Sequence, residues 1–188
     1  MENIYAPLDA SHVDQILALQ DRCWVFDRGI FILSSRALIE RSFQFRNFAF
    51  GAFAGEELVG FVTCSVPGHL AKMNLGRHFG FSDEMLDRVG HANSMAILPE
   101  YRRKGIGGKL FNLAMAAFPD SVEYIMTTTK LENALARQLI ESRGFRHEKT
   151  EEIAGDKRAI YVLHRTEEVK ARHRAAIRAG ARVPRHRR

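Results

Sequence analysis

The sequence is poor in cysteine and has no long apolar run. Its two cysteines, Cys23 and Cys64, form neither a CxxC pair nor a metal-ligand spacing, so free thiols in a reducing compartment are expected. The first residues, MENIYAPLDASHVDQ, lack the basic-then-apolar pattern of a signal peptide. No apolar run approaches the roughly 18 residues of a membrane span. These features predict a cytoplasmic protein that does not associate with a membrane.

Clustered metal ligands are also lacking. The eight histidines are scattered, without an HExxH motif or a His/Cys cluster, so no metal site is expected. The composition, with 46% hydrophobic and 27% charged residues over 188 positions, is typical of a globular protein with one sizeable core.

Positive charge is concentrated at the C-terminus. Residues 165–188 contain nine lysines or arginines and two glutamates, a net charge of +7, so residues 1–164 carry −1 of the total of +6. This change of composition predicts a near-neutral domain over 1–164 and a basic tail over 165–188. The tail is either a solvated extension, helical in its first part, or an element that contacts nucleic acid or another acidic partner.

Strand and helix patterns alternate along the first 164 residues. Alternating apolar residues and turn signals predict strands at 3–8, 48–53, 57–64, 90–97, 122–129, 146–153 and 158–164. Helical spacing predicts helices at 11–24, 34–43, 107–118 and 132–145. The expected fold is therefore α+β, with a mostly antiparallel mixed sheet of about seven strands and about four flanking helices. Residues 67–89 are a long insertion with one short helix, and we expect them to serve as a substrate wall.

The stretch PEYRRKGIGGKL, residues 99–110, places a basic glycine-rich turn between a strand and a helix. A Walker-type loop is excluded, because Arg103 and Leu110 occupy the positions that require glycine and serine or threonine. A GxGxxG fingerprint starting at Gly105 also fails at Leu110. What remains is either an anion cradle of backbone amides at a helix N-terminus or a solvated turn.

A family resemblance favours the cradle. The pattern Arg102-x-x-Gly105-x-Gly107 after MAILPEY resembles the acetyl-coenzyme A motif of the GNAT superfamily of N-acetyltransferases. The segment ENALARQLIESRGF is similar to the next helix of that family, with Asn133, Ala136, Gly144 and Phe145 at the characteristic positions. The resemblance covers roughly residues 3–164. It implies a GNAT-like fold and acetyl transfer from acetyl-coenzyme A by direct attack of a primary amine.

The resemblance also implies a cofactor site. Backbone groups of Met95, Ala96 and Ile97 would pair with the pantetheine arm on a strand that splays from its neighbour. The following turn would hold the pyrophosphate through Arg102, Arg103, Lys104, Gly105, Ile106, Gly107 and Gly108. Asn133 and Ala136, at the start of their helix, would flank the arm near the thioester.

The catalytic groups are less clearly marked. The tyrosine that many members use to protonate the leaving thiolate is replaced here by Ile140, for which Tyr124 and Ser142 are conceivable substitutes. Counting back 14 residues from Gly105, without gaps, puts His91 where the histone-acetylating branch has its glutamate base. A histidine suits proton removal near neutral pH, so His91 is the candidate base. The alternative is a histidine that only caps the strand entry. Glu40 and Asp27 are alternative groups for orienting a cationic amine.

Three functions are consistent with these residues. The first is acetylation of a small amine metabolite, which the sequence favours. The second is acetylation of a protein or an aminoacyl-tRNA docked by the tail, and the third is a non-catalytic acyl-coenzyme A binding module. A monomer or a homodimer is expected.

Overall fold

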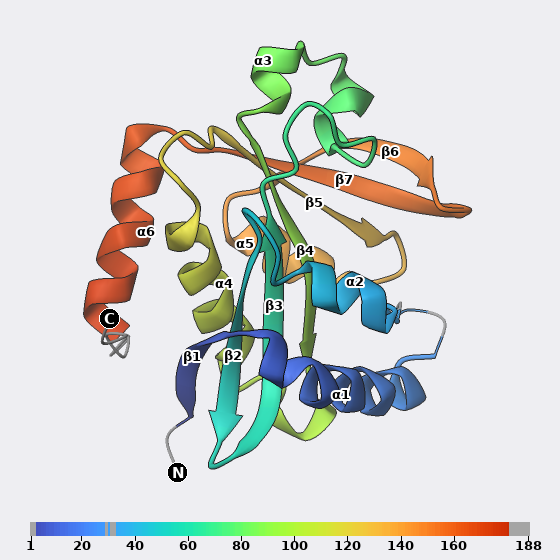
Figure 1. Ribbon diagram of the computed structural model, residues 1–188, viewed down its shortest axis with the longest axis vertical. Coiled ribbons are helices and arrows are strands. Elements are labelled where there is room, and N and C mark those ends of the chain that lie inside the picture. The colour runs from blue at the N-terminus through green and yellow to red at the C-terminus, as the bar shows by residue number, and fades with distance from the viewer. Residues whose placement is uncertain (1–2, 29, 31–32, 181–188) are drawn as a thin grey trace.

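A computed structural model describes residues 3–28, 30 and 33–180 (Figure 1). Within these residues, seven strands form a single sheet, which confirms the predicted α+β class. The strands are β1 (Ile4–Leu8), β2 (Phe48–Ala54), β3 (Glu57–Ser65), β4 (Val89–Ile97), β5 (Tyr124–Lys130), β6 (Arg146–Ile153) and β7 (Asp156–His164).

The strand order is β1-β2-β3-β4-β5-β7-β6. Neighbouring strands are antiparallel except β4 and β5, which are parallel. A parallel pair needs a crossover connection, and helix α4 supplies it between β4 and β5. The two predicted hairpins, β2–β3 and β6–β7, are both present.

Six α-helices and three short 3₁₀ turns accompany the sheet in the described chain. The α-helices are α1 (Val13–Phe26), α2 (Arg36–Arg41), α3 (Asp83–Leu86), α4 (Ile106–Ala117), α5 (Ala134–Ser142) and α6 (Glu167–Gly180). The four longer predicted helices correspond to α1, α2, α4 and α5. The four-residue α3 is the short helix expected in the insertion, and α6 forms in the first part of the basic segment, where a helix was one expectation. None of the described helices is long and apolar enough to cross a membrane.

The helices cover the two faces of the sheet. In Figure 1, α1 and α2 lie in front of the strands and α4 and α5 lie behind them. Helix α4 packs against β2, β3 and β4, and α6 packs against α4. Buried apolar residues recur along α4 at helical spacing, among them Ile106, Leu110 and Ala114. The start of α4 is thereby fixed against the sheet beside the end of β4.

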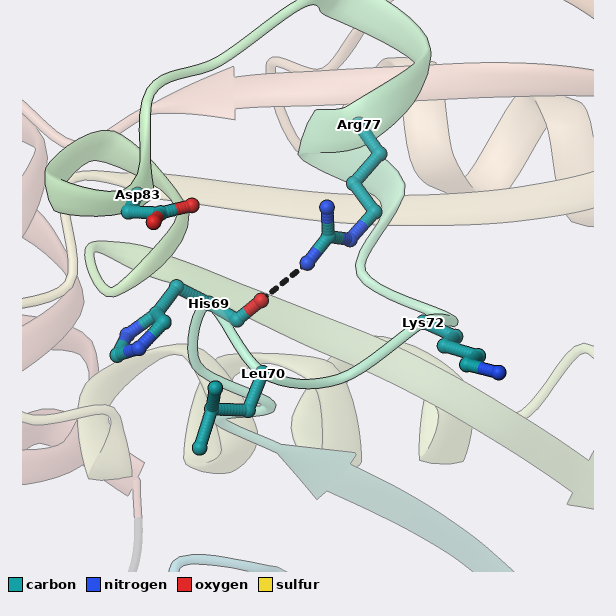
Figure 2. Close-up of a pocket in the computed structure, with 5 residues that line it drawn as sticks. All are labelled: His69, Leu70, Lys72, Arg77 and Asp83. Carbon is teal, nitrogen blue, oxygen red and sulfur yellow. Dashed lines mark hydrogen bonds between the residues drawn. The ribbon is translucent and has the colours of Figure 1, made fainter.

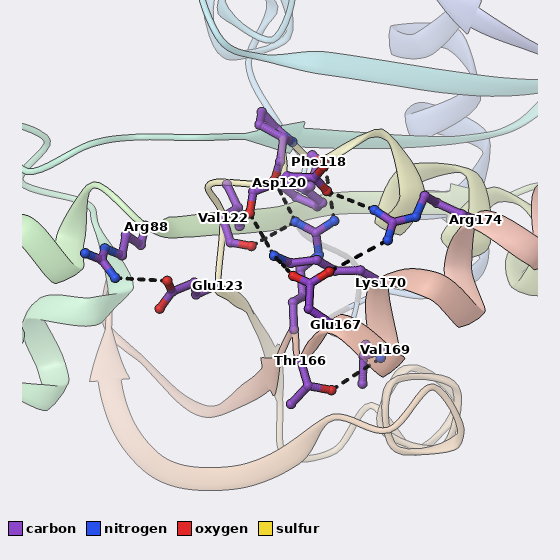
Figure 3. Close-up of polar contacts among 12 residues, drawn as sticks. Arg88, Phe118, Asp120, Val122, Glu123, Thr166, Glu167, Val169, Lys170 and Arg174 are labelled. Carbon is purple, nitrogen blue, oxygen red and sulfur yellow. Dashed lines mark hydrogen bonds and ion pairs between the residues drawn. The ribbon is translucent and has the colours of Figure 1, made fainter.

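The basic segment after His164 begins as part of the folded body. Arg165 is 3% exposed, and its guanidinium donates to carbonyls at the end of α4, at 2.8 Å to Pro119 O and 3.2 Å to Phe118 O. Lys170 Nζ donates to Asp120 O at 2.9 Å, and Arg174 pairs with the Asp120 carboxylate at 3.1 Å (Figure 3). Arg165 Nη2 also lies 3.5 Å from Met115 O, one of the last carbonyls of α4, which lack intrahelical partners. The basic side chains therefore supply donors to the end of α4 and to the turn that follows it.

The expectation of a separate tail is therefore not met for residues 165–174. Composition places a boundary at Arg165, whereas packing continues through it, because the basic side chains satisfy carbonyls and a carboxylate of the same chain. Helix α6 continues to Gly180, and residues 181–188, the last part of the predicted tail, lie outside the described residues.

Candidate functional site: a splayed strand pair and a basic turn

The sheet opens between β4 and β5. The two strands are paired only at three positions, from Val89 opposite Tyr124 to His91 opposite Met126. Beyond this point β4 remains paired with β3, and β5 remains paired with β7 up to Lys130. In Figure 1 the two strands diverge from a common origin. Residues 92–97 thus have an edge without a neighbouring strand, and an extended ligand can pair there with free backbone groups.

A β-bulge lies where the strands separate. Val62 of β3 faces Met95 and Cys64 faces Ala92, so that Asn93 and Ser94 of β4 lie opposite one residue, Thr63. The buried Thr63 hydroxyl accepts a hydrogen bond from the Ser94 amide at 3.2 Å. A bulge redirects side chains and ends regular pairing. This one gives the vertex of the opening a polar lining.

Hydroxyl groups from the sheet and from the segment before α2 meet at that bulge. The Ser94 and Ser34 hydroxyl oxygens are 3.4 Å apart, and Asn93 Nδ2 donates to Ser65 Oγ at 3.1 Å. Ser34 is held in place by Gln20 of α1, which is buried and bonds both the Ser34 amide and carbonyl. No local sequence pattern marks Gln20 or Thr63 as part of the site, since both act through tertiary contacts.

The basic turn presents a run of unpaired amides. Arg103 and Gly105 both have a positive φ, +60° and +79°, which turns the chain sharply into α4. The amides of residues 103–108 have no acceptor among the described residues, and intrahelical bonding begins with Lys109 N donating to Gly105 O at 3.1 Å. A helix N-terminus with converging free amides and a positive dipole end attracts anions. The arrangement fits a pyrophosphate.

The glycines at 107 and 108 have different neighbours. A β-carbon on Gly107 would lie 3.0 Å from Ile97 Cδ1 and 3.4 Å from a Leu139 methyl group, so glycine is needed for the close approach of α4 to β4 and α5. A β-carbon on Gly108 would lie 2.4 Å from Nη2 of Arg143. Arg143, the residue before the Gly-Phe pair, was not singled out from the sequence.

Arg102 has a structural partner. Its Nε donates to Ile97 O at 3.0 Å, and its two terminal nitrogens bond both carboxylate oxygens of Asp27 at 3.1 and 2.5 Å. The hydrogen bonds that Arg102 donates to the Asp27 carboxylate are the main reason that the pKa of Arg102 is raised. The guanidinium thus fixes the turn to the end of α1, and the exposed cations of the turn are Arg103 and Lys104.

His91 is buried and already bonded. It is 7% exposed, and its Nε2 accepts a hydrogen bond from the Leu75 amide at 3.1 Å. Burial lowers its pKa to about 4. A base needs a free lone pair directed at its substrate, whereas the Nε2 lone pair of His91 is occupied. These contacts argue against His91 as the base and correspond more closely to the alternative structural role.

The other residues considered for the catalytic roles are Tyr124, Ser142, Asp27 and Glu40, together with Ile140 at the position of the usual tyrosine. Ile140 is buried in the core. Tyr124 stacks on His164 at the paired end of β5, and the Ser142 hydroxyl donates to Leu139 O at 2.7 Å. The Asp27 carboxylate is bound to Arg102, and Glu40 is on the exposed surface of α2. The structure brings none of these five groups together.

At the start of α5, Asn133 acts as a helix cap. Its side-chain oxygen accepts a hydrogen bond from the Ala136 amide at 3.0 Å, as is usual for asparagine in this position. This contact fixes the first turn of the helix that follows β5, on the far side of the opening from β4.

The insertion is an ordered structure at the paired end of β4. Buried Asn74 ties it together by donating to Gly68 O and Leu86 O, both at 2.9 Å. Lys149 of β6 donates to His78 O at 2.8 Å. Figure 2 shows the hollow on its surface, which is lined by His69, Leu70, Lys72, Arg77 and Asp83. In this hollow the Arg77 guanidinium reaches the His69 carbonyl.

The mixed sheet opens between β4 and β5, and a glycine-rich helix start lies at the opening. This architecture is that of a GNAT-like acetyltransferase fold. The sequence model of the Acetyltransferase (GNAT) family matches residues 13–145. The chain therefore belongs to that family, whose members are acyltransferases. No curated protein sequence matches the chain.

Solved structures of the same fold share little sequence with the chain. The ribosomal-protein-S18-alanine N-acetyltransferase from Escherichia coli is 15% identical, with a TM-score of 0.64 over 87% of this chain and 94% of that one. NAA60 from Arabidopsis thaliana in complex with acetyl-CoA is 16% identical, with a TM-score of 0.66 over 87% and 98%. The aminoglycoside acetyltransferase AAC(6')-Ib in complex with coenzyme A and kanamycin is 16% identical, with a TM-score of 0.67 over 92% and 99%.

No group of three or more histidine, cysteine, aspartate or glutamate side chains is arranged to hold a metal ion in the part of the chain that the structure describes.

Proposed function

We propose that the protein transfers an acetyl group from acetyl-coenzyme A to a primary amine, by direct attack within a ternary complex. The observation that carries this proposal is the free edge of β4 leading to the unpaired amides of residues 103–108. Acetyl-coenzyme A supplies the activated acyl group. Two of the similar structures contain acetyl-CoA or coenzyme A.

Different residues of the opening would bind different parts of the cofactor. Backbone groups of Met95, Ala96 and Ile97 would pair with the pantetheine arm as an added strand. The amides from Arg103 to Gly108 would hold the pyrophosphate, with Arg103 and Lys104 adding long-range attraction. Asn133 and Ala136 would border the arm from the α5 side.

Arg102 has a positioning role in this proposal. Both terminal nitrogens and Nε are bonded within the chain, so Arg102 would shape the turn rather than bind phosphate. His91 would likewise position the insertion, by bonding the Leu75 amide. The polar groups at the bulge, Ser34, Ser94 and Asn93, lie where β4 and β5 separate, at the end of the opening that an arm paired with β4 would approach. We infer that they orient the acceptor.

For the acceptor, a small amine is retained as the first candidate. The cations of residues 165–174 that would dock a nucleic acid are partly committed within the chain, as with Arg165, Lys170 and Arg174. Titratable thiols give no indication of another mechanism: Cys23 and Cys64 are buried, free and have raised pKa values because of burial. A cytoplasmic location and the oligomeric state stay predictions.

The test is coenzyme A release followed with a thiol reagent across small amines, peptides and aminoacyl-tRNA. We expect release with small amines. A chain ending at Gly180 keeps the described helix α6 and removes four arginines, and we expect it to retain this activity. Activity on aminoacyl-tRNA or peptide alone, lost on this truncation, would support the second function. Tight acetyl-coenzyme A binding without release for any acceptor would support a non-catalytic binding module.

A further inference from the structure

Arg143 lies against the first turn of α4. Its Nη2 is 2.4 Å from the position that a β-carbon on Gly108 would take. The guanidinium therefore occupies space that exists only because residue 108 is glycine. Gly108 is also the third residue of α4, with one of the unpaired amides described above.

This guanidinium has few partners. Within the described part of the chain, its one hydrogen bond joins Nη1 to Asn112 Oδ1 at 3.4 Å, and its Nε is buried without a hydrogen-bond partner. Among the described residues, no carboxylate lies within ion-pair distance of it. Arg102 and Arg174, by contrast, each pair with an aspartate. Most of the five donors of Arg143 are thus available to a ligand.

The surroundings of Arg143 are positive. The start of α4 carries the positive end of the helix dipole and free amides. Arg172 of α6 also approaches, with Nη2 3.5 Å from where a β-carbon on Gly144 would lie. The nearby charges of Arg172, Arg165 and Arg143 add to burial in lowering the pKa of His173 to about 4. Like charges gathered without an anion repel one another, and a bound anion removes that cost.

We propose that Arg143 binds the 3′-phosphate of coenzyme A, so that the protein discriminates coenzyme A from 3′-dephospho-coenzyme A. The inference rests on the proposed function. The pyrophosphate already has the amides of residues 103–108, so the phosphate on the ribose is the remaining anion of the cofactor. A planar guanidinium with free donors can bind a phosphate through two hydrogen bonds at once.

The test compares binding of coenzyme A and 3′-dephospho-coenzyme A by calorimetry. For Arg143→Gln we expect affinity for coenzyme A to fall about tenfold or more, the loss typical of a charged hydrogen bond, and affinity for the dephospho form to change less than about twofold. Arg41→Gln, on the exposed surface of α2 across the sheet, is the control for loss of one positive charge and should bind both ligands as the wild type does.

A second variant displaces the guanidinium without removing it. Gly108→Ala keeps the backbone amide and fills the place of Nη2, so the ratio of its affinities for coenzyme A and the dephospho form should fall, and any effect on the pyrophosphate contact at residue 108 is measured by the dephospho form. Combining it with Arg143→Gln should add little, because both changes remove one contact.

The outcomes separate the two proposals. Equal losses for both ligands in Arg143→Gln, or no loss for either, would overturn the 3′-phosphate assignment and leave the proposed function intact. A folded wild-type protein that binds neither ligand would overturn the proposed function itself.

Discussion

Asp27 and Arg102 form a bidentate ion pair, with 3.1 and 2.5 Å between their nitrogen and oxygen atoms. The pair joins the end of α1 to the turn that begins α4, across 75 residues of sequence. Both side chains are 24% exposed, so the pair is partly shielded from water.

Breaking this pair should loosen the turn. We expect Asp27→Asn to lower the free energy of unfolding by about 1–3 kcal/mol, since it leaves a partly buried charge without its partner, and to weaken coenzyme A binding. The control is Asp14→Asn, which breaks the exposed pair with Arg36 and should cost at most about 1 kcal/mol. Urea unfolding measures both variants, and equal losses would contradict a special role for Asp27.

The role of His91 is tested by comparing two substitutions. His91→Gln provides a side-chain oxygen for the Leu75 amide, and we expect it to keep most of the acetyl-transfer activity. His91→Ala leaves that amide unpaired and should lose about 1–3 kcal/mol of stability. Activity is followed by coenzyme A release and stability by thermal unfolding. A folded His91→Gln protein that loses more than a hundredfold in turnover would restore His91 as the base.

The pKa of His91 also predicts how stability depends on pH. Its value is about 4 in the folded protein and about 6.5 in the unfolded chain, so between these values the unfolded state binds the extra proton. Stability should therefore fall as pH decreases from 6.5 to about 4. His91→Gln removes this contribution, while that of His173 remains. Denaturant titrations from pH 7 to pH 4 should show a smaller decrease for the variant, and identical curves would contradict the assignment.

Arg165 should be a major contributor to the docking of α6. Arg165→Met removes the donors that satisfy buried carbonyls at the end of α4, and we expect a loss of about 2–4 kcal/mol. Arg174→Met breaks an exposed pair with Asp120 and should cost about 1 kcal/mol or less. Urea unfolding compares the two. Similar losses would mean that Arg165 does not differ from a surface cation.

Local patterns in the sequence predicted the strands, the main helices and the turn before α4. Their signals, such as alternating apolar residues and the glycines at 105 and 107, are contained within short segments. The family resemblance predicted that β4 splays from β5. The length of the unpaired edge is known only from the strand register in the structure.

Long-range partners could not be predicted in the same way. Composition counted Arg165 as part of a basic tail, whereas its partners lie at the end of α4. Counting residues placed His91 on β4 but could not predict that the Leu75 amide donates a hydrogen bond to its Nε2. The position of Arg143 beside α4 could not be predicted, because the guanidinium fits there only in the absence of a side chain at Gly108.

The central claim is that the turn before α4 holds coenzyme A. Two glycines that share a positive φ, one in this turn and one far from it, test the claim directly. Gly105 and Gly155 have φ values of +79° and +81°, with open space around each. Valine at either position should cost about 1–3 kcal/mol of stability, because a β-branched residue is strained there. Calorimetry should show a loss of coenzyme A affinity of about tenfold or more for Gly105→Val and wild-type affinity for Gly155→Val, which changes only the β6–β7 turn. Equal affinities in the two variants would contradict the account.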